Sequence, residues 1–347
     1  FGDYAVTIVV ADDSGPDLRT AIEALDGVEG YDTAGRSPVL HLLLSRHAID
    51  TTDLETVGGV RGVHRLRPVL PVISRRDMSV PFHHASQLSP EEELGRRPLS
   101  DWALDYETTR GGIDERHVLD TAIQLTEIMR RGVEAGLAGT EYQDRILGWQ
   151  SGRFIETANA GRLLDGGLLN RMIPYVTALM EAKSAMQVIV AAPTAGSCAT
   201  FPGALLATVD ELGVDTDRAA RAMLTGGLIG VFVTNRSSFA AEVGGCQAET
   251  GAGAAMAAAA LVELAGGSAA VSLSAASQAL QNVLGLVCDP IGNRVEAPCL
   301  GRNVTGAANA LSCANMALAG YDHLVPLDEV LDAHRSISEI IPRELCC

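Results

Sequence analysis

The sequence predicts an α+β protein in which a small unit of strands and helices precedes a large unit made of helices alone. In residues 1–75, short apolar strand patterns alternate with helix patterns. Residues 76–98 are polar and have no clear period, which is typical of a linker. From residue 99 to 347 nearly every stretch has a helical pattern, rich in the Ala and Gly that let helix backbones approach closely. We therefore expect two folded units joined by a linker.

The first unit has the predicted order strand, helix, strand, strand, helix, strand. The strands are expected over 4–11, 29–35, 38–45 and 63–73, and the helices over 17–25 and 51–59. This βαββαβ order is typical of a ferredoxin-like fold. It is similar to ACT domains, which bind amino acids as dimers, and this resemblance implies a homodimer. A passive packing module is the alternative, because a fold does not determine a function.

Helices are expected throughout the second unit. The predicted stretches are 101–111, 114–139, 168–192, 203–213, 215–236, 254–267, 272–288, 303–320 and 327–341.

Composition excludes several classes of function. The 347 residues are 47% hydrophobic, enough for a sizeable core. A net charge of -17 and a pI near 4.8 argue against nucleic-acid or anionic-membrane partners, since both need a basic surface. The seven cysteines lack closely paired spacing, and we find no signal peptide and no apolar run of membrane-spanning length. We expect a protein of the reducing cytoplasm.

Three of the cysteines stand where Gly or Pro interrupts a helical pattern. Cys246 follows two glycines, Cys288 precedes Asp289-Pro290, and Cys299 follows Pro298, so all three are expected at helix ends. Their separations are 42 residues (288 minus 246) and 11 residues (299 minus 288), unlike the close pairs of structural zinc sites. Three cysteines would leave one iron of a 4Fe-4S cluster without a protein ligand, whereas buried cysteines that serve as small apolar side chains are the commoner case.

Four motifs carry a family resemblance. They are APTAGSC (192–198), GGCQAE (244–249), QNVLGLVCDP (281–290) and APCLGRN (297–303). In this order they resemble the alpha region of the iron-sulfur-dependent L-serine dehydratases, and the similarity covers the chain from about residue 88 onward.

The resemblance implies a cofactor and a reaction. The cofactor is a 4Fe-4S cluster held by Cys246, Cys288 and Cys299, with no need for pyridoxal phosphate. The implied reaction is a β-elimination that converts the small amino acid L-serine to pyruvate and ammonia, with the open iron as Lewis acid. Cys198, in the first motif, is expected to be a packing residue because the resemblance assigns the cluster to the other three.

The first and last motifs supply candidate substrate-binding residues. The loop around Thr194, Gly196 and Ser197 exposes backbone N–H groups ahead of a helix, which suits a carboxylate. The alternative is an ordinary turn between helices, capped by Ser197. Arg302 and Asn303 follow Cys299, and the guanidinium fork suits a carboxylate as well.

The catalytic base has several candidates. Lys183 is the one lysine among 26 basic residues, and it precedes the first motif. When desolvated, it can act as a base or pair with the substrate carboxylate, and an exposed surface lysine is the alternative. Glu249 lies three residues after Cys246 and would share its helix face. The thiolates at the C-terminus are the remaining candidates.

The chain departs from the family in three places. Gly301 stands where relatives carry Lys, and residues 145–153, with the bulky Trp149, replace an S-G-L-T-G-G substrate loop. The Ser-Ser-His-Thr segment of the family's beta region is absent, so any contribution from it is absent or comes from another chain, a beta-type subunit. The alternatives are therefore a related lyase (acting on cysteine, threonine or a larger 3-hydroxy amino acid) and a non-catalytic iron-sulfur sensor or subunit.

The sequence ends in two cysteines. Adjacent cysteines bridge each other only with strain, and Cys347 carries both a thiol and a carboxylate, so the tail resembles a substrate. The expectation is that Cys347 folds back to cap the open iron in the resting protein, and that deleting Cys346 and Cys347 leaves a cluster more labile to oxygen. A solvated tail is the alternative.

Overall fold

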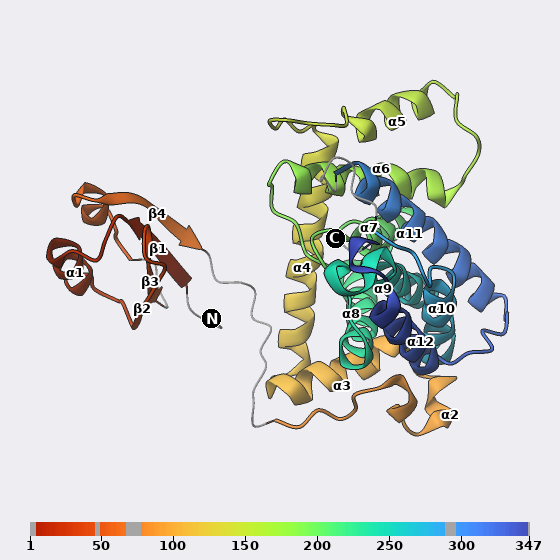
Figure 1. Ribbon diagram of the computed structural model, residues 1–347. Coiled ribbons are helices and arrows are strands. Elements are labelled where there is room, and N and C mark those ends of the chain that lie inside the picture. The colour runs from red at the N-terminus through yellow and green to blue at the C-terminus, as the bar shows by residue number, and fades with distance from the viewer. Residues whose placement is uncertain (1–4, 46–48, 67–77, 289–295, 346–347) are drawn as a thin grey trace. The chain divides into compact units, whose positions relative to one another are not determined.

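The chain folds into two compact units, residues 1–76 and 77–347. The computed structural model describes residues 5–45, 49–66, 78–288 and 296–345. The predicted α+β class is confirmed, because the first unit contains a four-stranded sheet and the second is built from helices (Figure 1).

The N-terminal unit is a sheet with short helices. Its elements are β1 (Ala5–Ala11), α1 (Pro16–Glu23), β2 (Gly30–Ala34), β3 (Val39–Ser45), the 3-10 helix η1 (Asp53–Thr56) and β4 (Val60–Leu66). The antiparallel sheet has the order β2-β3-β1-β4. Val9 and Leu43 on its central strands pack with Leu18 of α1 and Leu54 of η1. The similarity to ACT domains remains a prediction.

Two details of this unit differ from the expected elements. The helix expected over 51–59 is the single turn η1, because Gly58 and Gly59 follow it and Gly59 has a φ of 89°. The last strand begins at Val60, three residues earlier than expected, and its expected continuation over 67–73 lies outside the described residues.

The second unit is a helical assembly around one central helix. Its elements are η2 (Ala85–Gln87), α2 (Glu91–Leu94), α3 (Leu99–Gly111), α4 (Glu115–Leu137), α5 (Gln150–Asn159), α6 (Leu168–Ser184), α7 (Thr200–Leu212), α8 (Thr216–Arg236), α9 (Ala241–Leu264), α10 (Ala269–Gln281), α11 (Glu296–Leu318), α12 (Leu327–Ile340) and η3 (Arg343–Leu345).

Helix α9 lies at the centre of this assembly, where α7, α8, α10, α11 and α12 pack around it (Figure 1). Every residue from Gly251 to Val262 is buried, so the helix is apolar on all sides, as a core helix must be. Its Ala-rich sequence lets neighbouring backbones approach closely. Within the described ranges, none of the helices has both the length and the apolar character needed to cross a bilayer.

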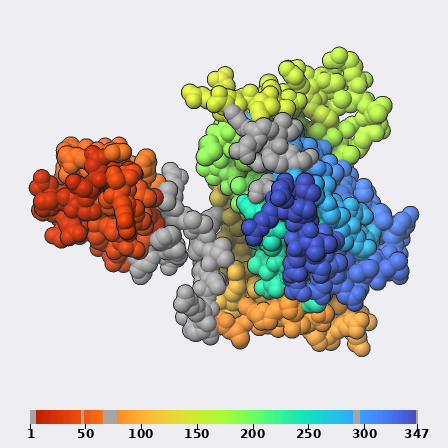
Figure 2. Space-filling model, viewed as in Figure 1, coloured from red at the N-terminus to blue at the C-terminus, as the bar shows by residue number. Residues whose placement is uncertain are grey.

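The stretch expected to be a linker is described from residue 78 onward, where it packs against the helical unit. Phe82 and Leu88 are buried in the same core as α8 and α9. The backbone N–H groups of Ala85 and Ser86 donate to the Asp328 carboxylate on α12, at 3.2 and 3.0 Å. Figure 2 shows α12 in dark blue on the visible face of this unit.

Two helices end earlier than the sequence pattern predicts, and both ends shape the candidate site. α6 ends at Ser184 rather than near residue 192, with Met186 at a φ of 57° just beyond it. α10 ends at Gln281 rather than at Cys288, and Gly285 has a φ of 84°. The apolar residues that follow continue the helical hydropathy pattern, but they form loops. The loop after α10 packs against the first turns of α9.

Candidate functional site

Cys246 lies at a kink within α9. Gly245, directly before it, has φ 65° and ψ -162°, which interrupts the helix in a conformation that favours glycine. A Cβ atom on Gly245 would lie 3.1 Å from the Leu286 carbonyl oxygen and 3.3 Å from the Cys288 nitrogen. The kink therefore brings the backbone that carries Cys288 directly against the backbone that carries Cys246.

The segment with Cys288 is held by hydrogen bonds to its neighbours. The Gln247 N–H donates to the Leu286 carbonyl (2.8 Å), and the Gly285 N–H donates to Gln247 Oε1 (2.7 Å). The Cys288 N–H donates to the carbonyl of Leu345, close to the C-terminus (2.9 Å). The end of the chain therefore reaches this segment, although Cys346 and Cys347 themselves lie outside the described residues.

Cys299 lies in the first turn of α11, and Asn303 joins that turn to the APTAGSC loop. The Asn303 amide donates to the carbonyls of Cys299 (2.8 Å) and Gly196 (2.9 Å). Its Oδ1 accepts from the N–H groups of Ala199 (3.2 Å) and Thr200 (2.9 Å), at the start of α7. The N–H groups at the start of α7, which we expected to face an anion, therefore donate to Asn303. A contact between Asn303 and the substrate remains a prediction.

The three cysteines predicted as cluster ligands differ in state: Cys246 and Cys299 are thiols, whereas Cys288 is disulfide-bonded in this structure. All three are buried, with exposed fractions of 2% for Cys246 and 4% for both Cys288 and Cys299. Within the described residues, no three Cys, His, Asp or Glu side chains already form a metal site. Metal binding commonly completes the ordering of its ligands. The three buried sulfur atoms fit a cluster once Cys288 is reduced.

The APTAGSC loop closes on Glu249 of α9. Thr194 Oγ1 donates to Glu249 Oε1 (2.6 Å) and accepts from the Ser197 N–H (3.0 Å). A Cβ atom on Gly196 would lie 2.5 Å from Glu249 Oε2, so this position has no room for a larger side chain. The Ser197 hydroxyl is buried and has no hydrogen-bond partner among the described residues. Thr194, Gly196 and Glu249, predicted separately, therefore lie together.

Glu249 and Lys183 form the charged part of the site. Burial raises the pKa of the Glu249 carboxyl, and the Thr194 hydroxyl and the Lys183 charge partly oppose this effect. Burial also raises the pKa of the Cys198 thiol to about 12, again opposed by Lys183. Lys183, half-buried near the end of α6, therefore lies close enough to act on both groups.

Cys198 and Arg302 lie beside this charged part of the site. Cys198 Sγ contacts the Met180 sulfur at 4.0 Å, which fits a packing role for this thiol. Arg302 is half-buried one residue before Asn303, and its contact with substrate remains a prediction.

Two further carboxylates, which sequence analysis missed, hold the segment around Trp149 in place. Glu296 at the start of α11 accepts from the Tyr142 hydroxyl (2.5 Å) and from the Leu147 (3.0 Å) and Ile146 (3.3 Å) N–H groups. Burial would raise the pKa of Glu296, but these hydrogen bonds outweigh it and lower the pKa. Burial, together with the hydrogen bond to Glu296, raises the pKa of Tyr142 to about 12.

The second of these carboxylates is Glu181, which is 3% exposed on α6. It accepts from the Gln150 N–H (2.6 Å) and the Ser151 hydroxyl (2.5 Å), and Arg145 lies 3.4 Å away. Glu181 is two residues from Lys183, and Glu296 is three residues from Cys299. A buried acidic residue this close in sequence to a predicted site residue could have indicated which helices hold the segment 142–151.

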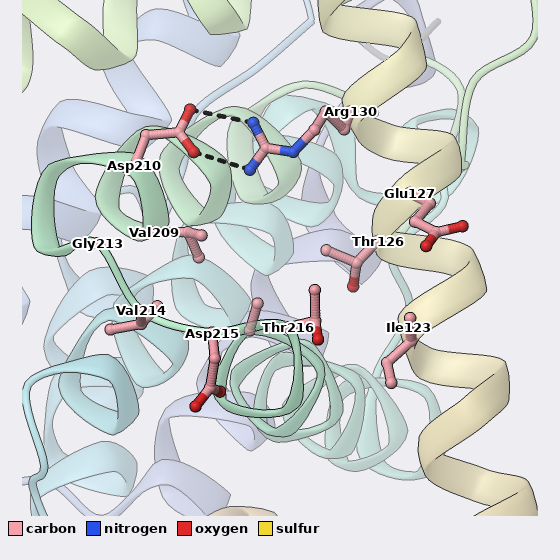
Figure 3. A pocket seen from close by; sticks show the side chains of 11 residues that line it. Ile123, Thr126, Glu127, Arg130, Val209, Asp210, Gly213, Val214, Asp215 and Thr216 are labelled. Carbon is pink, nitrogen blue, oxygen red and sulfur yellow. Dashed lines mark hydrogen bonds and ion pairs between the residues drawn. The ribbon is translucent and has the colours of Figure 1, made fainter.

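A pocket of about 400 Å³ lies between α4, α7 and α8 (Figure 3). None of the predicted site residues lines it. Its Arg130 guanidinium forms two hydrogen bonds with Asp210, at 3.1 and 2.8 Å, and Asp210 also accepts from Tyr175 (2.7 Å). The Arg130 and Asp210 charges at this pocket are thus paired with each other, and we place the candidate site at the kink of α9 instead.

Comparison with known proteins gives consistent matches. The family model described as "Serine dehydratase alpha chain" matches residues 53–347. A "Probable L-serine dehydratase, alpha chain" of Bacillus subtilis is 40% identical over 63% of this chain and 73% of that protein. The "L-serine dehydratase, alpha chain" of Peptoniphilus asaccharolyticus is 37% identical over 68% of this chain and 81% of that protein. The "L-serine dehydratase TdcG" of Escherichia coli is 41% identical over 46% of this chain and 35% of that protein.

Proposed function

The chain belongs to the serine dehydratase alpha-chain family, and from this membership we propose that it is a lyase that converts L-serine to pyruvate and ammonia. The observation that supports the proposal is the contact of the APTAGSC loop with Glu249 near the kink of α9, where the backbones that carry Cys246 and Cys288 lie against each other. The family names support the substrate, and the arrangement of side chains supports the chemistry.

We assign Cys246, Cys288 and Cys299 as the ligands of a 4Fe-4S cluster, with Cys347 as a further ligand in the resting protein. When bound, such a cluster supplies one iron without a ligand from these three thiolates, which acts as a Lewis acid toward the leaving hydroxyl group. The Cys288 N–H bond to Leu345 supports the assignment of Cys347, because it brings residue 345 to the ligand segment.

We assign Glu249 to the removal of the α-proton. A carboxylate whose pKa is raised by burial is a stronger base than an exposed one, and the hydrogen bond from Thr194 holds its position. The proton taken from Cα balances the one that the departing hydroxyl needs to leave as water. The remaining aminoacrylate takes up water and yields pyruvate and ammonia.

We assign Lys183 and Arg302 to the substrate carboxylate, whose charge they would balance. Backbone N–H groups of the Thr194–Ser197 loop other than that of Ser197, which donates to Thr194, would orient the same group, since backbone donors suit a carboxylate. Residues 142–151 would form the wall that faces the substrate side chain, because Glu181 and Glu296 attach this segment to the helices that carry Lys183 and Cys299.

The proposal extends to assembly and location. We propose a homodimer through the N-terminal unit, a beta-type subunit as a separate partner, and the reducing cytoplasm as the compartment. The alpha-chain names of two relatives support the separate subunit.

The experiment is anaerobic purification, reconstitution with iron and sulfide, and assay of L-serine, L-threonine and L-cysteine. We expect pyruvate and ammonia in equal amounts from L-serine, with a lower kcat/KM for the other two. Release of sulfide from L-cysteine with no turnover of L-serine would assign the chain to the desulfidase alternative. A loaded cluster with no product from any of the three would favour the sensor or a missing subunit.

A further inference from the structure

Gln247 is a fully buried amide next to Cys246, and its hydrogen bonds run to two other parts of the chain. Its exposed fraction is 0%. Its backbone N–H donates to Leu286, and its Oε1 accepts from the Gly285 N–H at 2.7 Å. Both acceptor and donor belong to the loop that ends in Cys288. Gln247 thus forms two hydrogen bonds to the loop that carries Cys288.

The other end of the same amide reaches α12. Gln247 Nε2 donates to Ser338 Oγ (3.0 Å) and to the His334 carbonyl (3.3 Å). Ser338 Oγ also donates to the His334 carbonyl (2.9 Å), and a Cβ atom on Gly244 would lie 2.5 Å from Ser338 Oγ. α12 therefore packs tightly on the first turn of α9, and the chain after it leads to Leu345, which bonds Cys288.

We propose that Gln247 is a positioning residue that sets the Cys288 loop against Cys246 before any cluster binds. The proposal rests on the proposed function only in treating Cys246 and Cys288 as cluster ligands. Because the loop leaves its helix at Gln281, the described backbone bond of residues 285–288 to their own segment is the single turn bond from the Leu286 N–H to the Val283 carbonyl (3.1 Å). Gln247 supplies both a donor and an acceptor to them, and α12 fixes the orientation of its amide.

Gln278 provides a matched control. It is also buried, with an exposed fraction of 6%, but its amide donates to Ser274 on its own helix at 3.2 Å. Replacing Gln278 removes a buried amide of the same size without removing a bond between segments. A general penalty for losing a buried glutamine would affect both positions, whereas a positioning role affects only Gln247.

The first measurement is hydrogen exchange of the peptide over 283–288 in the reduced, metal-free full chain. Removing the acceptor of the Gly285 N–H should let that amide exchange at least tenfold faster in Gln247→Leu than in wild type. Gln278→Leu should leave exchange of this peptide within twofold. Unchanged exchange in a folded Gln247→Leu variant would overturn the proposal, whether or not a cluster binds.

The second measurement is iron per chain after anaerobic reconstitution, with the rate of iron loss to a chelator. We expect Gln247→Leu to hold less than half of the wild-type iron and to lose it at least fivefold faster, while Gln278→Leu matches wild type. If wild type binds no iron but the exchange result holds, the proposed function fails and the positioning role stands.

A conservative variant covers the case in which Gln247→Leu loses its helical circular dichroism. Gln247→Glu keeps the acceptor for Gly285 but loses the donations to Ser338 and His334. It should therefore restore slow exchange over 283–288 and most of the iron. Fast exchange equal to that of the free peptide in Gln247→Glu would contradict the role of the Gly285 bond.

Discussion

The two ends of helix α9 carry the same type of side chain in similar surroundings, Glu249 near its first turns and Glu263 near its last. Burial raises the pKa of both carboxyls. Hydroxyl groups donate to both: Thr194 to Glu249 at 2.6 Å, and Ser100 (2.7 Å) and Thr225 (3.1 Å) to Glu263. By burial and hydrogen bonding alone, the two glutamates are equally good candidates for catalysis.

The two carboxylates differ in their surroundings. Around Glu249 lie a glycine kink, a thiol, the single lysine and the APTAGSC loop. Around Glu263 lie helices, because Ser100 belongs to α3 and Thr225 to α8. Glu263 ties three helices together, whereas Glu249 faces loops and helix ends. A raised pKa therefore does not by itself distinguish a functional carboxyl from one that joins helices.

Replacing each glutamate by glutamine tests this contrast with the largest expected effect. Glu249→Gln removes the base and should lower kcat at least 100-fold, the usual size of a general-base contribution. Glu263→Gln should keep kcat within threefold, since the described hydrogen bonds of Glu263 run to Ser100 and Thr225, outside the proposed site. Steady-state kinetics with iron content measured on the same samples checks both, and equal losses in the two variants would break the contrast.

A methyl group at Gly196 should act through Glu249. The added Cβ atom would lie 2.5 Å from Glu249 Oε2, so the carboxylate must move, and kcat should fall at least tenfold. Gly227→Ala, in α8, is the control, because nothing lies within 4 Å of its Cβ position. Equal activity in the two variants would show that the position of Glu249 does not matter.

Loss of the Glu296 carboxylate should affect substrate binding more than turnover. Glu296→Ala removes the acceptor for Tyr142, Ile146 and Leu147 and should loosen the wall of the site. We expect KM for L-serine to rise about tenfold with kcat within threefold, a loss of about 1.4 kcal/mol in uniform binding. A fall in kcat at constant KM would instead place this segment in the chemistry.

The smallest expected effect concerns stability at the far end of α9. Because burial in the folded state raises the pKa of Glu263 above its ordinary value of about 4.5, the contribution of this group to stability falls as pH increases from about 4.5 toward the folded pKa. Glu263→Gln removes that fall, by at most about 1.4 kcal/mol per pH unit. Denaturant titrations between pH 4.5 and 8 measure it, and a constant difference between wild type and variant would contradict the pKa shift.

Local patterns were enough to predict the α+β class, most helices, and the loop that contains Thr194 and Gly196. The predicted end of α10 at Cys288 was wrong. The hydropathy pattern stays helical to Cys288, but the backbone turns at Gly285, whose N–H donates to Gln247. Cys246, expected at a helix end, lies at a kink inside α9, which is helical on both sides of Gly245.

Contacts between distant parts of the chain were not predictable from one sequence. The bonds of Asn303 to Gly196 and Thr200 span about a hundred residues, and those of Glu296 to residues 142–147 span about 150. Periodicity reports which residues face a core, but it does not report which loop a buried carboxylate or amide will meet.

The most direct test of the account compares iron content across five cysteine-to-serine variants after anaerobic reconstitution. We predict that Cys246→Ser, Cys288→Ser and Cys299→Ser each lose most of the cluster. Cys198 and Cys313 are also buried thiols, with exposed fractions of 1% and 0%, and Cys198→Ser and Cys313→Ser should keep wild-type iron. Full iron in any of the first three variants, or its loss in Cys198→Ser, would contradict the proposed ligand set.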